Sequence, residues 1–184
     1  DAGKDIAKEN AEVLAVAEPL VNKAVELEAS SGEVLAARGR LAHLQDEPDV
    51  AIEIYNQALE ANPSMPMTRL ALAQLLVHKD EVNLAFNQYT IALQTDPLHP
   101  RIQKGFLWGL MSKGEYVDTI RYADQFFEQS KDVDLLSQAL NSHILIGQFD
   151  KALSYAQRFS SSTDFEKSVA YRVIEALYFL QRFE

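Results

Sequence analysis

The chain has no cysteine, which excludes disulfide bonds, thiolate metal sites and a cysteine nucleophile. It contains only 7 glycines and 6 prolines in 184 residues, too few chain breakers for a protein built from many short strands. No stretch approaches the ~18 continuous apolar residues of a membrane span, and the first residues, Asp1–Asp5, lack the apolar core of a signal peptide. We therefore expect a soluble protein. Because the lack of cysteine suits the cytoplasm and the periplasm equally, the compartment stays open.

Positive charge is also scarce, with 17 Lys and Arg against 27 Asp and Glu and a formal net charge of −10. Nucleic-acid affinity comes mainly from basic side chains that neutralise phosphates, so we expect no nucleic-acid partner for this domain. We likewise expect no membrane contact by this segment. A hydrophobic share of 47% is nevertheless too high for a disordered chain, and it predicts a folded core.

Residues that could form a catalytic or metal site are scattered. The histidines show no His-x-x-x-His or His–Glu pairing of the kind that zinc sites use; they are His43, His78, His99 and His143. The chain has no glycine-rich phosphate loop and no nucleophile elbow. We predict that the protein is not an enzyme, that it has no cofactor and no metal site, and that His143 is packed in the interior.

A repeat is the most informative feature that is present. The set Ala51, Tyr55, Ala58 and Pro63 recurs 34 residues later as Ala85, Tyr89, Ala92 and Pro97. A fixed period of this length indicates stacked supersecondary units, each too small to bury its apolar face alone. Apolar residues at helical spacing between the prolines make each unit a pair of helices. The expected helices span 17–28, 33–45, 49–60, 67–78, 82–95, 101–112, 116–129, 133–145, 149–160 and 166–180.

These residues resemble the tetratricopeptide repeat (TPR): a small residue in the first helix, then alanine, an aromatic residue and alanine in the second, and a proline after it. The resemblance implies an all-α, right-handed superhelical solenoid of antiparallel helix pairs that covers the chain as one repeat domain, 1–184. The units would be a partial one at 1–31, full ones at 32–65, 66–99, 100–132 and 133–166, and a partial one at 167–184.

Two departures from the pattern bear on packing. The third and fourth units place Leu107 and Leu140 where the first two have Gly39 and Ala73, and their second helices exchange alanine and aromatic positions. Since total size is conserved across the exchange, we expect compensated packing within one architecture. In addition, Arg69 and Gln103 stand where a large apolar residue is usual, which leaves the local geometry there open.

In proteins similar to TPR arrays, the first helices of successive pairs line a concave groove that binds a ligand. The positions carried over to this chain are Arg40, His43, Leu70, Gln74, Arg101, Lys104, Trp108, Met111, Asn141 and Tyr171, with Glu33, Ala36 and Met67 on the same face. The spacing from Arg101 to Met111 places a basic and aromatic stripe along one helix. The alternative is ordinary packing for Trp108 and ordinary solvation for the basic residues. Ala36 and Arg40 do not match the lysine and asparagine of chaperone-binding relatives.

The predicted function is a protein–protein interaction scaffold that binds a peptide or a partner helix, including an acidic or C-terminal segment. The alternative is a sensory or regulatory module of a larger bacterial protein, such as a membrane-anchored winged-helix transcriptional regulator, which Asp96–Pro100 and the following segment loosely resemble. The sequence has the character of a piece of a longer chain. Apolar residues near its end predict either further repeats or an end-to-end homodimer.

Overall fold

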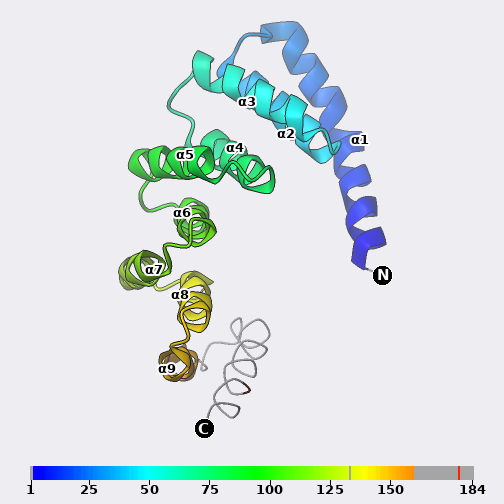
Figure 1. The fold of residues 1–184 in the computed structure, drawn as a ribbon. Coiled ribbons are helices and arrows are strands. Elements are labelled where there is room, and N and C mark those ends of the chain that lie inside the picture. The colour runs from blue at the N-terminus through cyan, green and yellow to red at the C-terminus, as the bar shows by residue number, and fades with distance from the viewer. Residues whose placement is uncertain (1, 133, 160–177, 179–184) are drawn as a thin grey trace. The chain divides into compact units, whose positions relative to one another are not determined.

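Helices make up all the regular structure in the part of the chain that is described. The computed structural model covers residues 2–132, 134–159 and 178. The chain divides into two compact units, Asp1–Thr95 and Asp96–Glu184. Each unit is built from helical hairpins, as Figure 1 shows.

The first unit contains five helices within its described residues: α1 (Ala2–Glu28), α2 (Gly32–Leu44), α3 (Pro48–Ala61), α4 (Pro66–His78) and α5 (Val82–Thr95). Helices α2 and α3 form one hairpin, α4 and α5 form the next, and α1 packs on α2. Proline is the first residue of both α3 and α4, where its missing N–H costs no helical hydrogen bond.

The second unit contains, in its described part, α6 (Pro100–Ser112), α7 (Tyr116–Ser130), α8 (Asp134–Leu145) and α9 (Phe149–Phe159). Helix α6 pairs with α7, α8 pairs with α9, and α6 also contacts α8. The first helices of two successive hairpins are therefore neighbours in this unit.

Each turn within a hairpin contains one residue in the left-handed backbone region. These residues are Asp46, Asp80, Gly114 and Gly147, with φ of 62°, 63°, 77° and 73°. They fall at the same place in successive units, so the repeat extends to backbone conformation. Aspartate tolerates this region better than most non-glycine residues, which explains how two types of residue serve one turn.

One hairpin in each unit shows a small residue packed against a large one, in opposite arrangements. In the first unit, a Cβ added to Gly39 would lie 2.6 Å from the Tyr55 ring, so glycine permits the ring to sit against α2. In the second unit, Leu140 packs with Ala152 and Ala156 instead. The first helix there supplies the bulk that the second helix lacks. This confirms the compensated packing expected from the exchange.

The expected helix bounds agree with the structure to within one residue for the seven helices from α2 to α8. The first helix is different: we expected it to begin at Ala17, with Pro19 in its first turn, whereas α1 begins at Ala2 and contains Pro19 in its interior. Residues with high helix propensity, alanine above all, precede Pro19 and continue the helix through it. The expected helix at 166–180 lies outside the described residues, apart from helical Tyr178. The single-domain division and its unit boundaries stay a prediction.

Candidate functional site

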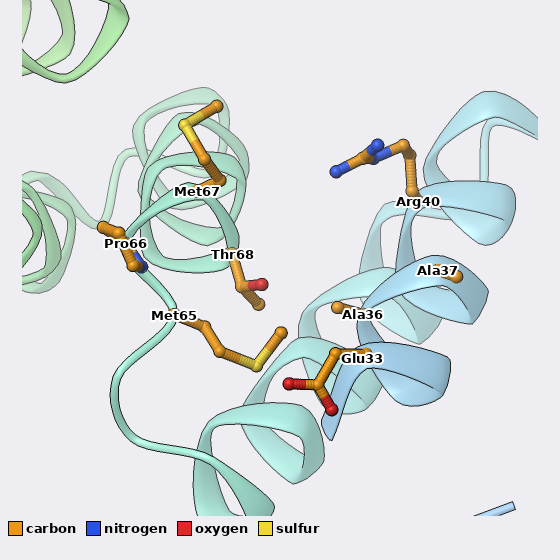
Figure 2. Close-up of a pocket in the computed structure, with 8 residues that line it drawn as sticks. All are labelled: Glu33, Ala36, Ala37, Arg40, Met65, Pro66, Met67 and Thr68. Carbon is orange, nitrogen blue, oxygen red and sulfur yellow. The ribbon is translucent and has the colours of Figure 1, made fainter. Parts of the chain in front are cut away.

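A pocket lies between the first helices of the two hairpins of the first unit. Its volume is about 310 Å³, and Figure 2 shows its lining: Glu33, Ala36, Ala37 and Arg40 from α2, and Met65, Pro66, Met67 and Thr68 from the start of α4. The floor is apolar, with two alanines on one side and two methionines on the other. Glu33 and Arg40 lie at opposite ends of the α2 face.

The negative end of the pocket is fixed by hydrogen bonds. Glu33 Oε1 accepts from Asn62 Nδ2 at 3.0 Å, and Glu33 Oε2 accepts from the Ser31 hydroxyl at 3.0 Å. Hydrogen bonds from the backbone, from Ser31 and from Asn62 hold the pKa of Glu33 below its usual value. The carboxylate therefore stays ionised, and it joins α2 to the turn that leads into α4.

Gly32 brings that turn close to α2. A Cβ at Gly32 would meet the Asn62 Cβ at 2.8 Å and the Met65 sulfur at 3.2 Å. The absence of a side chain thus lets Met65 lie across the first turn of α2, where it forms one wall of the pocket. Met65 is also the N-cap residue of α4, and no side chain caps that helix.

The positive end of the pocket is Arg40. Its side chain is exposed and has no ion-pair partner among the described residues. Its positive charge also acts on Tyr55. Burial raises the pKa of the Tyr55 hydroxyl, and electrostatic attraction to Arg40 opposes that rise. Between the two ends lies Thr68, which is 5% exposed and makes no hydrogen bond with any residue that the structure describes. Figure 2 shows its hydroxyl on the side that faces α2.

The other predicted groove residues of the first unit have different environments. His43 is exposed, and its pKa is lowered by burial and then by nearby His78. Gln74 is half-buried, and its backbone carbonyl oxygen lies 2.7 Å from the His78 Nδ1. Leu70 is 1% exposed and its side chain packs in the core, so its contact with a ligand stays a prediction. Its neighbours on α4, Leu72 and Ala73, are buried as well, and this part of the helix faces the core rather than the pocket.

In the second unit, the predicted basic and aromatic stripe lies along α6. Arg101 is exposed, whereas Trp108 and Met111 are half-buried. Lys104 already forms salt bridges with two aspartates: its Nζ lies 2.6 Å from Asp134 Oδ2 and 3.5 Å from Asp132 Oδ2. Partial burial opposes protonation of Lys104, but these two carboxylates raise its pKa. A ligand carboxylate would have to compete with both of them.

The remaining predicted positions are on α8 and beyond. Asn141 is half-buried, and its buried Oδ1 has no hydrogen-bond partner among the residues that the structure describes. Tyr171 and the apolar residues expected to mediate an end-to-end contact lie outside the described residues. His143 is 5% exposed, as predicted, and its Nδ1 lies 3.0 Å from Gln148 Oε1.

Sequence reasoning missed two features that shape the turns between hairpins. Arg69 donates from Nε and Nη2 to the Pro63 carbonyl at 3.3 and 3.0 Å. Gln103 donates from Nε2 to the Pro97 carbonyl at 2.9 Å. These bonds are equivalent, because both partners are displaced by 34 residues. The polar residues at a usually apolar position thus hold the turn that begins the next first helix, and the shared spacing to the preceding proline was the available clue.

It also missed four pocket residues, of which Ala37 lies on α2. The other three are Met65, Pro66 and Thr68, which belong to the loop before α4 and to the first turn of that helix. In the sequence pattern, this segment only marks where a helix begins. The packing of Gly32 against Met65 brings this segment to the pocket.

The described residues contain no candidate metal site. None of their groups of histidine and carboxylate side chains has the three members needed to hold a metal ion. In the same part of the chain, no helix combines the length and the apolar character needed to cross a bilayer.

Comparison with known proteins identifies similar folds at low sequence identity. Neither a protein-family model nor a curated protein matches the chain. Among solved structures, YrrB, described as a TPR protein with an unusual peptide-binding site, matches with a TM-score of 0.69 and 17% identity over 89% of this chain and 85% of its own. A thermophilic TPR protein of Thermus thermophilus matches with a TM-score of 0.68 and 14% identity over 95% and 98%. The pilF protein of Pseudomonas aeruginosa matches with a TM-score of 0.69 and 14% identity over 99% and 93%.

Proposed function

Because the chain has the tetratricopeptide-repeat fold, we propose that it is a protein–protein interaction scaffold that holds a peptide or a partner helix between the first helices of successive hairpins. The observation that carries this proposal is the pocket between α2 and α4. Its lining includes residues at inner-face positions that the repeat pattern assigns to the first helices, namely Glu33, Ala36, Arg40 and Met67. Two methionines contribute flexible apolar surface of the kind that adapts to different side chains.

The size and lining of the pocket suit one side chain of a bound peptide. Its volume of about 310 Å³ is at the lower end of the range of small-molecule sites, roughly 300–1,000 Å³. It therefore accommodates one large side chain. A partner would gain further contacts along the faces of α2 and α4, where Arg40, His43 and Gln74 are accessible.

The experiment is a selection from a random peptide library on the immobilised protein, followed by binding to a variant with a filled pocket. Ala37→Phe places a ring in the pocket, whereas Ala71→Phe places the same ring on α4 outside it. We expect the selected peptides to bind the wild-type protein and the Ala71→Phe variant but to lose affinity for Ala37→Phe. Equal binding to all three proteins would show that the pocket is not the binding site.

A second part of the proposal concerns the ligand of the stripe on α6. We infer that an acidic or C-terminal segment binds along Arg101 and Trp108 and changes the fluorescence of the single tryptophan. Binding that is unchanged in Trp108→Ala would remove this site and leave the pocket unaffected. A regulatory module attached to an effector would use the same surfaces, so these variants test the binding step for either role.

A further inference from the structure

The pocket between α2 and α4 has a charge at each end and an apolar floor between them. Glu33 and Arg40 are seven residues apart on α2, which is two helical turns, or roughly 10 Å along the helix axis. An extended peptide advances about 3.3 Å per residue, so this distance corresponds to roughly three residues. The spacing of the charges thus restricts the spacing of complementary charges on a ligand.

The two charges differ in how available they are. Arg40 is exposed and lacks an ion-pair partner within the described residues, so its five N–H donors are free to bind a carboxylate. Glu33 is held in place by its backbone, Ser31 and Asn62, but a carboxylate has about four lone-pair sites and retains acceptor capacity after these hydrogen bonds. It can therefore receive a basic side chain while keeping its position.

The middle of the pocket is suited to an apolar side chain and to a peptide backbone. The floor consists of Ala36, Ala37, Met65 and Met67. Thr68, which as a whole residue is 5% exposed, supplies a hydroxyl that makes no hydrogen bond with the described residues. A peptide N–H or carbonyl group is a suitable partner for this hydroxyl. The first turn of α4 also has no side-chain cap, so the N–H groups of Met67 and Thr68 are available as donors. In contrast, Pro66 has no N–H, and the Arg69 N–H donates to the Met65 carbonyl.

We propose that this pocket binds an internal, extended peptide segment in which one large apolar residue stands between an acidic and a basic residue about three positions apart. The acidic residue pairs with Arg40, the apolar residue fills the space between the methionines and the alanines, and the basic residue pairs with Glu33. This inference rests on the proposed scaffold function and specifies the chemistry of its ligand.

The test compares four labelled peptides of equal length by fluorescence anisotropy at physiological salt. One carries glutamate and lysine three positions apart with a leucine between them, one carries two glutamates, one carries two lysines, and one replaces the leucine of the first with serine. We expect the wild-type protein to bind the first most tightly. Arg40→Glu should move the preference to the doubly basic peptide and Glu33→Lys to the doubly acidic one, each by roughly fivefold.

Two control variants separate local pairing from the effect of net charge. Arg38→Glu lies on α2 but does not line the pocket, and Glu60→Lys lies on α3. Each changes the net charge as much as the corresponding test variant, and each should keep the wild-type order of peptides. If Arg40→Glu shows the same order as Arg38→Glu, the inference is overturned.

The inference remains testable if Glu33→Lys fails to fold, because Arg40 is exposed and its reversal alone distinguishes the outcomes. Failure here is also distinct from failure of the scaffold proposal. Suppose that library peptides bind the wild-type protein and lose affinity for Ala37→Phe, while the charge variants keep the wild-type order of peptide affinities. The scaffold proposal then stands, and the inference about the ligand chemistry is wrong. If no library peptide depends on the pocket, both are wrong.

Discussion

At the scale of single residues, the contact between Gly39 and Tyr55 is the most demanding in the first unit. A Cβ at position 39 would lie 2.6 Å from the ring, and Tyr55 is only 2% exposed. The ring has no free direction in which to move. The Tyr55 hydroxyl is buried and has no hydrogen-bond partner in the described part of the chain, which is a cost that the burial of the ring must exceed.

This contact gives a double-mutant prediction. Gly39→Leu should destabilise the protein through overpacking, and Tyr55→Ala should destabilise it by about 3–5 kcal/mol through a cavity. Together they reproduce the leucine–alanine arrangement of the later hairpins, so the double variant should be more stable than the sum predicts by about 1–3 kcal/mol. Urea denaturation measures each free energy of unfolding. Gly39→Leu combined with Tyr89→Ala is the control, and it should show no such coupling.

His143 should make stability depend on pH. Burial lowers its pKa from 6.5, Lys151 lowers it further, and Gln148 and Asp124 oppose the shift. The folded state therefore binds fewer protons than the unfolded state near pH 6.5, and the free energy of unfolding falls as the pH drops through this value. His43 contributes in the same direction. In His143→Gln, denaturation at several pH values should show a smaller slope than in the wild-type protein, whereas an unchanged slope would assign the effect to other groups.

At the scale of helices, prolines of the same kind have opposite effects according to position. Pro48 is the first residue of α3, where its lack of an N–H removes no bond. Pro19 is exposed in the interior of α1, where it removes one helical hydrogen bond and crowds the preceding turn.

Pro19→Ala should stabilise α1 by about 1–3 kcal/mol, because alanine restores the N–H and has the highest helix propensity. Little packing is lost, since Pro19 is exposed. Hydrogen exchange should show greater protection of the α1 amides in this variant. Pro48→Ala is the matched control and should give no gain; an equal gain at both positions would contradict the argument.

The polar residues that hold the turns give a second prediction at this scale. Arg69→Leu removes two bonds to the Pro63 carbonyl and one from Nη1 to Gln88 Oε1 at 2.7 Å, and should cost about 1–3 kcal/mol. Gln103→Leu removes one hydrogen bond, but it also removes a buried oxygen, Oε1, that has no hydrogen-bond partner within the described residues. Its cost in thermal or urea denaturation should therefore be smaller. The reverse order would contradict the assigned roles.

The helices could be predicted from the sequence because the residues that mark where they begin and end are local signals. Proline, the aromatic position and the 34-residue period are each visible in one chain, and they fix the helices from α2 to α8 to within a residue. The prediction that Pro19 lies in the first turn of a helix was wrong, because residues of high helix propensity on both sides continue the helix through it. The environments of Leu70 and Lys104 could not be predicted for another reason: the repeat pattern assigns a helix face, but it contains neither the burial around Leu70 nor the carboxylates of Asp132 and Asp134. The pocket itself depends on the packing of Gly32 against Met65, a contact between distant parts of the unit.

At the scale of the whole molecule, the net charge of −10 sets a general electrostatic cost. Like charges repel more strongly in the compact state than in the unfolded chain, and dissolved salt screens them. Exposed ion pairs such as Lys79–Asp49 and Arg121–Asp118 contribute little in return.

The melting temperature should accordingly rise as ionic strength increases from low to physiological values. NaCl and KCl should act equally, because the effect is one of screening rather than of specific ion binding. In contrast, the affinity for the peptide with one acidic and one basic residue should fall under the same change. If the melting temperature falls with salt, attractive ion pairs outweigh the repulsion and the argument from net charge is wrong.

The two versions of the small–large contact have a consequence for building new arrays from this chain. A first helix carrying Gly39 requires a tyrosine opposite, whereas one carrying Leu140 requires alanine opposite. A first helix moved alone from one hairpin to another would thus meet either a collision or a void. The unit that can be transplanted, duplicated or recombined is therefore the complete hairpin, and the chain contains two mutually incompatible sets of interchangeable parts.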